Sequence, residues 1–302
     1  MAFSSGPCLF ESAAHAKLYL KFRPTYPTGV LDKILSFLSE KVSPPFEVAM
    51  DIGCGSGQGT RYLTPHFREV VGVDVSDGQL QEAQKITKEE NIVYRQGSAE
   101  EIPATDDSID LVTSAQSLHW FNIERFFSEC NRVLKPKGCV AAYSGGVPLP
   151  CTPNKEIQGL MQEQFKQIYF GLLGPYWDKR RTPIYNLYRD VHLPFKEYKR
   201  FVQNFYLLFL TRDTSLIRKH IVRVDDMLGY IMSLSSYQVY VRKFPEKADV
   251  LSDYRKRFLD ILQPLSPSTP AEEIEFDFVC PIVILLGRKD ENSSEIDRVN
   301  RS

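Results

Sequence analysis

The chain has 302 residues, enough for one large domain or for one domain with substantial insertions. Its net charge is -1, so no basic field is available to hold a nucleic-acid backbone. Six cysteines lack C-x-x-C spacing, the start lacks the pattern of a secretory signal, and the longest apolar run is far shorter than the ~20 residues of a membrane-spanning helix. We therefore expect a cytoplasmic protein with reduced thiols and with no nucleic-acid or membrane partner. The sequence leaves the oligomeric state open, and a monomer is the favoured expectation.

Two helical segments are predicted ahead of the first strand. Residues 10–22 carry apolar side chains at four-residue steps, which indicates a helix that covers one edge of the domain. Prolines on both sides of Tyr26 end that helix. In the alternative interpretation, Tyr19, Arg23 and Tyr26 lean over a ligand, with Arg23 as the partner of its carboxylate. Residues 30–38 are predicted to form a second helix with one apolar face.

Residues 48–59, VAMDIGCGSGQG, are predicted to be a buried strand that breaks into a glycine-rich turn. Such a turn has a backbone that can bend sharply and approach a ligand closely. Asp51 ends the strand, and Asp74 closes the next apolar run at the ~20-residue distance typical of a ribose-binding carboxylate. A dinucleotide fingerprint needs glycine at position 58 or 60, where Gln58 and Thr60 stand. This spacing counts against a nicotinamide-dependent oxidoreductase.

Strands and helices alternate up to residue 145, which indicates a doubly wound, mostly parallel sheet. We expect further strands at 69–74, 91–96, 109–114 and 139–143, and helices at 59–66, 78–90 and 123–134. Ligands bind at the carboxyl ends of such strands, so the loop at 115–121 is the best place to look for chemistry. Gln116 and His119 are the candidates there. A packed pair of His119 and Trp120 that opens the next helix is the competing explanation.

After residue 148 the alternation stops, and we expect a mainly helical cap over 148–270 with helices at 154–170, 224–234 and 248–262. One sheet strand is predicted near 195–210, an antiparallel last strand at 271–288, and a disordered tail at 289–302. The segment 171–190 is rich in aromatic and arginine side chains. They suit a substrate-binding wall, or solvated arginines beside ordinary aromatic packing: Tyr176, Trp177, Arg180, Arg181, Tyr185 and Arg189.

Several motifs together resemble the small-molecule, type 11 branch of class I S-adenosylmethionine-dependent methyltransferases, especially proteins like trans-aconitate methyltransferase. They are the opening Tyr19-x-x-x-Arg23-Pro-x-Tyr26-Pro27, the glycine run, Gly97-x-Ala99-Glu100, Ser114-x-Gln116-x-x-His119-Trp120-Phe121 and Ser233-x-Ser235-x-Tyr237. The resemblance implies a Rossmann-like core over 1–147 and S-adenosylmethionine as cofactor, with no metal. Where Ser98 stands, the family commonly has an aspartate for the adenine amino group. The implied cofactor-binding residues are Tyr19, Arg23, Asp51, Gly53, Gly55, Gly57, Asp74, Val75, Ser98, Ala99, Glu100, Ser114 and Gln116.

The implied reaction is an in-line displacement that moves the methyl group from the sulfonium to a small organic acceptor and leaves S-adenosylhomocysteine. A carboxylate acceptor, which the closest resemblance implies, is ionised at neutral pH and needs no base. A phenol or amine would make His119 a proton acceptor, with Gln116 near the donor sulfur. The candidate substrate residues are Tyr26, Trp120, Tyr176, Arg180, Arg181 and Arg189. A non-catalytic cofactor-binding or interaction module of the same fold is the alternative that Ser98 motivates.

Overall fold

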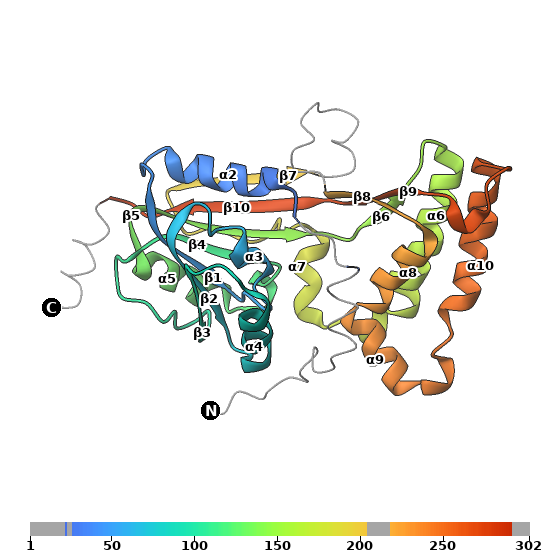
Figure 1. Cartoon of the computed structure of the whole chain (residues 1–302), viewed down its shortest axis with the longest axis horizontal. Helices are drawn as coiled ribbons and strands as arrows, with labels where there is room; N and C mark the ends of the chain where they lie inside the picture. The colour runs from blue at the N-terminus through green and yellow to red at the C-terminus, as the bar shows by residue number, and fades with distance from the viewer. Residues whose placement is uncertain (1–21, 23–25, 204–217, 292–302) are drawn as a thin grey trace. The chain divides into compact units, whose positions relative to one another are not determined.

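The structure is a computed structural model that describes residues 22, 26–203 and 218–291 (Figure 1). The expected helix at 10–22, with Tyr19, and the candidate Arg23 therefore lie outside the described residues, apart from Phe22. Contacts divide the chain into two compact units. The sheet unit holds residues 27–146, 180–203 and 281–291, and the helical unit holds residues 22, 26, 147–179 and 218–280.

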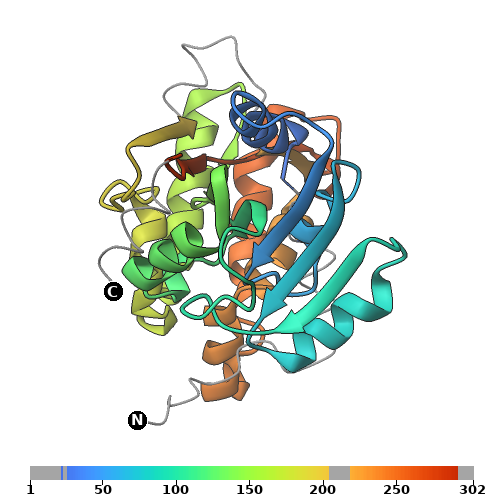
Figure 2. The same ribbon diagram turned by 90° about the vertical axis from the view of Figure 1, so that its left-hand side faces the viewer.

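The sheet unit is built on seven strands in the order β3-β2-β1-β4-β5-β10-β7. β10 is antiparallel to both of its neighbours, and the pairs from β3 to β5 are parallel. This confirms the predicted doubly wound sheet with an antiparallel last strand. The turned view in Figure 2 shows the blue to green strands side by side. The bounds are β1 Phe46–Ile52, β2 Phe67–Asp74, β3 Ile92–Gln96, β4 Ile109–Ala115, β5 Leu134–Gly145, β7 Glu197–Gln203 and β10 Ile282–Arg288.

Helices cover both faces of this sheet, because the central strands are apolar on both sides. Alternate β5 and β10 residues such as Val140 and Val283 join Phe126 and Phe127 of α5 (Ile123–Val133) in one buried core. Helix α2 (Thr28–Ser39) lies against the same two strands from the opposite side (Figure 1). Helix α4 (Asp77–Ile86) packs beside β2 and β3.

Two predicted helices end earlier than expected. The helix at 59–66 is the short α3 (Gln58–Arg61), since Pro65 has no N–H and disfavours helical geometry in the residue before it. The helix at 78–90 ends at Ile86, where Thr87 turns extended and its hydroxyl donates to Ala83 O at 2.7 Å. Ser76 and Asn122 cap α4 and α5 with their side-chain oxygens, so both starts follow ordinary helix-capping chemistry.

The helical unit combines α6 (Lys155–Lys166), α8 (Val224–Met232), α9 (Ser235–Lys243) and α10 (Leu251–Leu262) with a three-stranded sheet. Its strand order is β6-β9-β8, with bounds Leu149–Cys151, Phe276–Cys280 and Arg218–Val222. Met161, Phe165, Ile231, Phe258 and Phe278 are among its buried core. None of the helices in the described part of the chain is both long and apolar enough to cross a membrane.

The single strand expected at 271–288 is two strands in two different sheets, β9 and β10, separated by Pro281. Proline cannot donate to a sheet ladder, so the break falls where the backbone loses a donor. The strand expected at 195–210 is β7, and residues 204–210 lie outside the described part. The remaining short elements are α7 Thr182–Tyr185, a π turn Gln167–Leu172, and 3-10 turns at Leu118–Trp120, Gly174–Tyr176, Lys179–Arg181, Pro245–Lys247, Gln263–Leu265 and Ala271–Glu273.

Candidate active site

The turn after β1 has left-handed backbone at three glycines. Gly53, Gly55 and Gly57 have φ values of 70°, 53° and 74°, which residues with a Cβ rarely adopt. The turn is fastened to the end of β2, because the N–H groups of Gly53 and Cys54 donate to Val73 O at 2.8 and 3.0 Å. The glycine turn is therefore a backbone surface that is held in a fixed conformation.

Asp74 links that turn to the end of β2. Its Oδ2 accepts from Gly55 N at 2.9 Å, and its Oδ1 accepts from Ser76 N at 2.9 Å. Burial raises the pKa of the carboxyl, and these backbone hydrogen bonds oppose the rise. A carboxylate has about four lone-pair positions, so acceptor capacity is left for ligand hydroxyls. The next side chain, Val75, is 67% exposed and offers an apolar surface beside the acid.

Asp51 has a different environment from Asp74. It is 1% exposed, and its two oxygens accept hydrogen bonds from Thr60 Oγ1 and Thr113 Oγ1, both at 2.8 Å. Burial raises the pKa of Asp51 to about 6, although the two threonine bonds favour the charged form. The carboxyl group thus ties β1 to α3 and to β4. Any effect of Asp51 on a ligand is therefore indirect, through the position of β1, α3 and β4.

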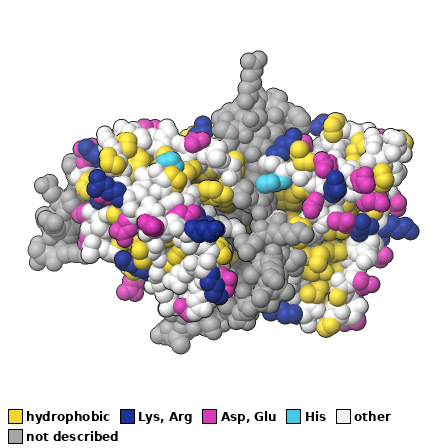
Figure 3. Space-filling view, viewed as in Figure 1, with side chains coloured by type: hydrophobic (Ala, Val, Ile, Leu, Met, Phe, Trp, Pro, Cys, Tyr) yellow, Lys and Arg dark blue, Asp and Glu magenta, His cyan; other side chains and the backbone are white. Residues whose placement is uncertain are grey.

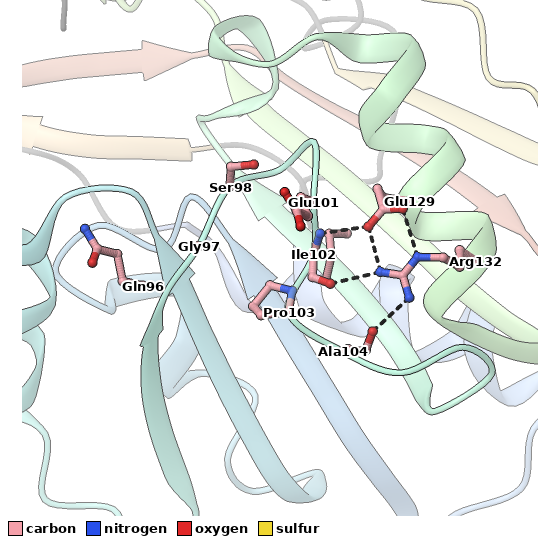
Figure 4. Close-up of a pocket in the computed structure, with 9 residues that line it drawn as sticks. All are labelled: Gln96, Gly97, Ser98, Glu101, Ile102, Pro103, Ala104, Glu129 and Arg132. Atoms are coloured by element: carbon pink, nitrogen blue, oxygen red, sulfur yellow. Dashed lines mark hydrogen bonds and ion pairs between the residues drawn. The ribbon is translucent and has the colours of Figure 1, made fainter. Parts of the chain in front are cut away.

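The loop after β3 carries the other predicted cofactor residues. Ala99 is buried in the core, and Glu100 Oε1 accepts from Asn122 N at 2.8 Å, which fastens the loop to the start of α5. Ser98 lines a recess of about 600 Å³ (Figure 4), whose wall is braced by Arg132 against Glu129 at 2.6 Å. The full lining is Gln96, Gly97, Ser98, Glu101, Ile102, Pro103, Ala104, Glu129 and Arg132. The lining includes neither the glycine turn nor Asp74.

The loop after β4 is hydrogen-bonded to the glycine turn after β1 and to the end of β5. Ser117 Oγ donates to Gly53 O at 2.8 Å, so this loop holds the glycine turn from the other side. Gln116 has φ 58°, and its Oε1 accepts from Gly145 N at 2.7 Å and from Ser144 Oγ. Its amide therefore reaches the end of β5. Ser114, also predicted to bind cofactor, is fully buried, and no described residue partners its hydroxyl.

His119 lies in the same loop and is 6% exposed. Its Nδ1 is 2.9 Å from the hydroxyl of Tyr188, and its ring stacks at a tilt on Trp120 with centroids 4.7 Å apart. The Arg180 guanidinium lies over the Trp120 ring, 4.6 Å from the ring centroid. The sheet unit therefore places a histidine, two aromatic residues and an arginine beside the carboxyl end of β4.

Tyr188 is the residue that the sequence interpretation missed. Its backbone and that of Leu187 have φ values of 53° and 54°, so two consecutive non-glycine residues turn left-handed and carry the tyrosine inward. Arg200 of β7 stabilises this turn by donating to Tyr188 O at 2.6 Å and to Val191 O at 2.7 Å. Burial raises the pKa of the Tyr188 hydroxyl to about 12, so it remains protonated at neutral pH.

The other substrate candidates are divided between the units. Arg181 belongs to the sheet unit, where its positive charge lowers the pKa of the Tyr188 hydroxyl and so opposes part of the rise from burial. Arg189 is exposed on the same segment. Tyr26 and Tyr176 belong to the helical unit. The Tyr176 ring packs edge-on against Tyr240 and Phe244, with centroids 5.4 and 6.3 Å apart. Within the described ranges, no group of three His, Cys, Asp or Glu side chains could hold a metal ion.

Comparisons with known proteins agree with this geometry. Residues 50–142 match a family model described as a methyltransferase domain. A Dictyostelium discoideum protein named as a methyltransferase is 29% identical over 91% of this chain and 93% of its own length. A Saccharomyces cerevisiae protein named as an S-adenosylmethionine-dependent methyltransferase is 34% identical, over 44% of each chain.

A solved structure from Anaeromyxobacter dehalogenans, described as a type II methyltransferase, superimposes with a TM-score of 0.67. It is 26% identical, and the match covers 88% of this chain and 98% of that one. The seven-stranded fold, the turn and acid at its carboxyl edge, and these relatives lead to one conclusion. Residues 50–142 are similar to a methyltransferase domain, and the fold of the chain is similar to that of a solved methyltransferase.

Proposed function

We propose that this chain transfers a methyl group from S-adenosylmethionine to a small organic acceptor and releases S-adenosylhomocysteine. The observation that carries the proposal is the 2.9 Å hydrogen bond from Gly55 N to Asp74 Oδ2. It brings the glycine turn and the acid, 19 residues apart in sequence, together at one edge of the sheet. A neutral ribose diol can donate to the remaining lone pairs of Asp74, while a backbone without side chains accommodates the methionine part.

The residues present fit that cofactor. A Cβ at Gly53 would lie 2.6 Å from Ser117 Cβ, and one at Gly57 would clash with the Tyr94 hydroxyl, so the turn is shaped as a bare backbone surface. We assign ribose binding to Asp74, apolar contact with the base to Val75, and a polar contact to Ser98. Asp51 acts indirectly, by holding the strands on which the turn rests. The cofactor supplies an already activated, cationic methyl donor.

For the acceptor, we propose a small molecule that binds beside the β4 loop. Arg180, fixed over Trp120, would orient an anionic group such as a carboxylate, and an ionised carboxylate needs no base to react. Positioning and exclusion of water then provide most of the acceleration. The face in Figure 3 carries acidic and basic side chains interspersed, in keeping with the net charge of -1. The finer resemblance to trans-aconitate methyltransferase stays a prediction.

Release of S-adenosylhomocysteine from purified protein tests the proposal, with S-adenosylmethionine supplied and a panel of carboxylic acids, phenols and alcohols as acceptors. We expect turnover with at least one class and none without an acceptor. Cofactor binding with no turnover on a broad panel would favour the non-catalytic module. Absence of binding to both the cofactor and its demethylated product would overturn the proposal itself.

A further inference from the structure

Tyr94 of β3 reaches across β2 and ends beside the glycine turn, all within the sheet unit. Tyr94 and Gly72 are paired residues of the two strands. A Cβ at Gly72 would lie 2.6 and 2.7 Å from two carbons of the Tyr94 ring, so the ring occupies the space at this glycine. A Cβ at Gly57 would collide with the Tyr94 hydroxyl and lie 2.9 Å from Tyr94 Cζ. One side chain therefore fills the space left open by two glycines, one in β2 and one in the turn.

The Tyr94 hydroxyl is fixed by the end of α4. It is hydrogen-bonded to Thr87 Oγ1 at 2.9 Å, and Thr87 Oγ1 donates to Ala83 O in the last turn of that helix at 2.7 Å. The threonine hydroxyl is therefore itself held by the backbone of α4. Packing against Gly72 and the hydrogen bond to Thr87 together hold the tyrosine ring in one orientation. The contact between the Tyr94 hydroxyl and Gly57 is thus a contact with a restrained group.

The hydrogen bonds of the turn around Gly57 are local. Gly57 N donates to Cys54 O at 3.0 Å, and Ser56 O accepts from Arg61 Nη1 at 3.1 Å. These bonds close the turn on itself and on α3, but they do not set its distance from β3. Tyr94 supplies that contact from a distant part of the sequence. Because glycine tolerates a wide range of backbone conformations, removal of the tyrosine hydroxyl would leave space into which Gly57 can shift.

We propose that Tyr94 is a positioning residue for the methyl donor, because its hydroxyl sets the place of Gly57 in the turn that receives the amino-acid part of the cofactor. This rests on the proposed methyl transfer and adds a residue that shapes its cofactor site from behind the backbone. Tyr94 acts through Gly57. Its effect is therefore confined to the part of the ligand that the turn accommodates. The nucleoside part, which we assign to Asp74 and Val75, is independent of it.

Two ligands separate these parts in calorimetric titrations of the full chain. S-adenosylhomocysteine contains both, whereas 5′-methylthioadenosine keeps the nucleoside and the sulfur and lacks the amino-acid group. We expect Tyr94→Phe to weaken S-adenosylhomocysteine binding by ~2- to 10-fold, which corresponds to the net contribution of one hydrogen bond, and to leave 5′-methylthioadenosine binding unchanged. A general loss of stability would weaken both ligands equally. Tyr198→Phe, with a side chain 54% exposed on β7, should change neither affinity.

Thr87 provides a second pair of variants that keeps the tyrosine. Thr87→Val removes the partner of the Tyr94 hydroxyl and should give the same selective loss, whereas Thr87→Ser keeps a hydroxyl and should bind like the unchanged protein. Unchanged S-adenosylhomocysteine affinity in both Tyr94→Phe and Thr87→Val, or an equal loss for the two ligands, would overturn the inference while the proposed function stands. Failure of the proposed function would instead appear as absence of S-adenosylhomocysteine binding by the unchanged protein, which would remove the inference with it.

Discussion

Gly53 and Gly55 provide a matched pair for testing whether the turn is shaped by its backbone. Both have left-handed φ, so alanine costs ~1–2 kcal/mol at each from backbone strain alone. At Gly53 the new Cβ would also lie 2.6 Å from Ser117 Cβ and 3.0 Å from Phe121 Cζ, and such overpacking costs a further ~1–3 kcal/mol. At Gly55 the nearest atom is Gln79 Oε1, 3.6 Å away, which is ordinary contact. We therefore expect Gly53→Ala to cost about 2–5 kcal/mol and Gly55→Ala about 1–2 kcal/mol.

Urea unfolding followed by tryptophan fluorescence measures this difference. The chain has two tryptophans, Trp120 in the sheet unit and Trp177 in the helical unit. A Trp177→Phe background therefore restricts the signal to the unit that contains the turn, and both alanine variants are compared in that background. Equal free energies of unfolding for the two variants would refute the steric argument. A larger loss for Gly55→Ala would mean that Ser117 does not confine the turn.

Two further predictions concern charged side chains. Burial raises the pKa of Asp51 in the folded chain to about 6, against an ordinary value of 3.8. The unfolded chain therefore releases this proton first as the pH rises, and raising the pH from 3.8 to about 6 should lower the free energy of unfolding by about 3 kcal/mol. Asp51→Asn should abolish that fall in free energy of unfolding between pH 4 and pH 6.5, and parallel curves for the two proteins would contradict it. Arg180→Gln should raise KM for a carboxylate acceptor by ~10-fold or more with kcat nearly kept, because a charge-assisted hydrogen bond is lost. Arg189→Gln is the matched control, and an equal KM in both variants would count against Arg180.

Much of the site was predictable because it depends on local sequence signals. Alternate glycines predict a sharply bent turn, and the acid predicted to follow one strand later lies next to that turn, where it accepts a hydrogen bond from Gly55 N. The parallel part of the sheet followed from the alternation of apolar strands and amphipathic helices. Each of those patterns lies within about 20 residues of the sequence, so no contact between distant segments was needed to predict it.

The remaining features depend on contacts between distant segments. Tyr188 is turned inward by left-handed backbone at two non-glycine residues and by Arg200 from another strand, which no local pattern indicates. Helix α9 (Ser235–Lys243) went unpredicted because its tyrosines and valines favour strands, and packing in the helical unit overrides that preference. The break between β9 and β10 is an exception, because Pro281 is itself a local signal that the last strand is interrupted.

Calorimetric titration of S-adenosylhomocysteine tests the central claim most directly, because it needs no knowledge of the acceptor. The unchanged protein should bind, and Asp74→Asn should weaken binding by ~10-fold or more, since an amide offers one acceptor oxygen in place of two. Asp77→Asn, an exposed acid three residues further on, should bind like the unchanged protein. Equal affinity in the two variants, or no binding by the unchanged protein, would contradict the assignment of this edge of the sheet as the cofactor site.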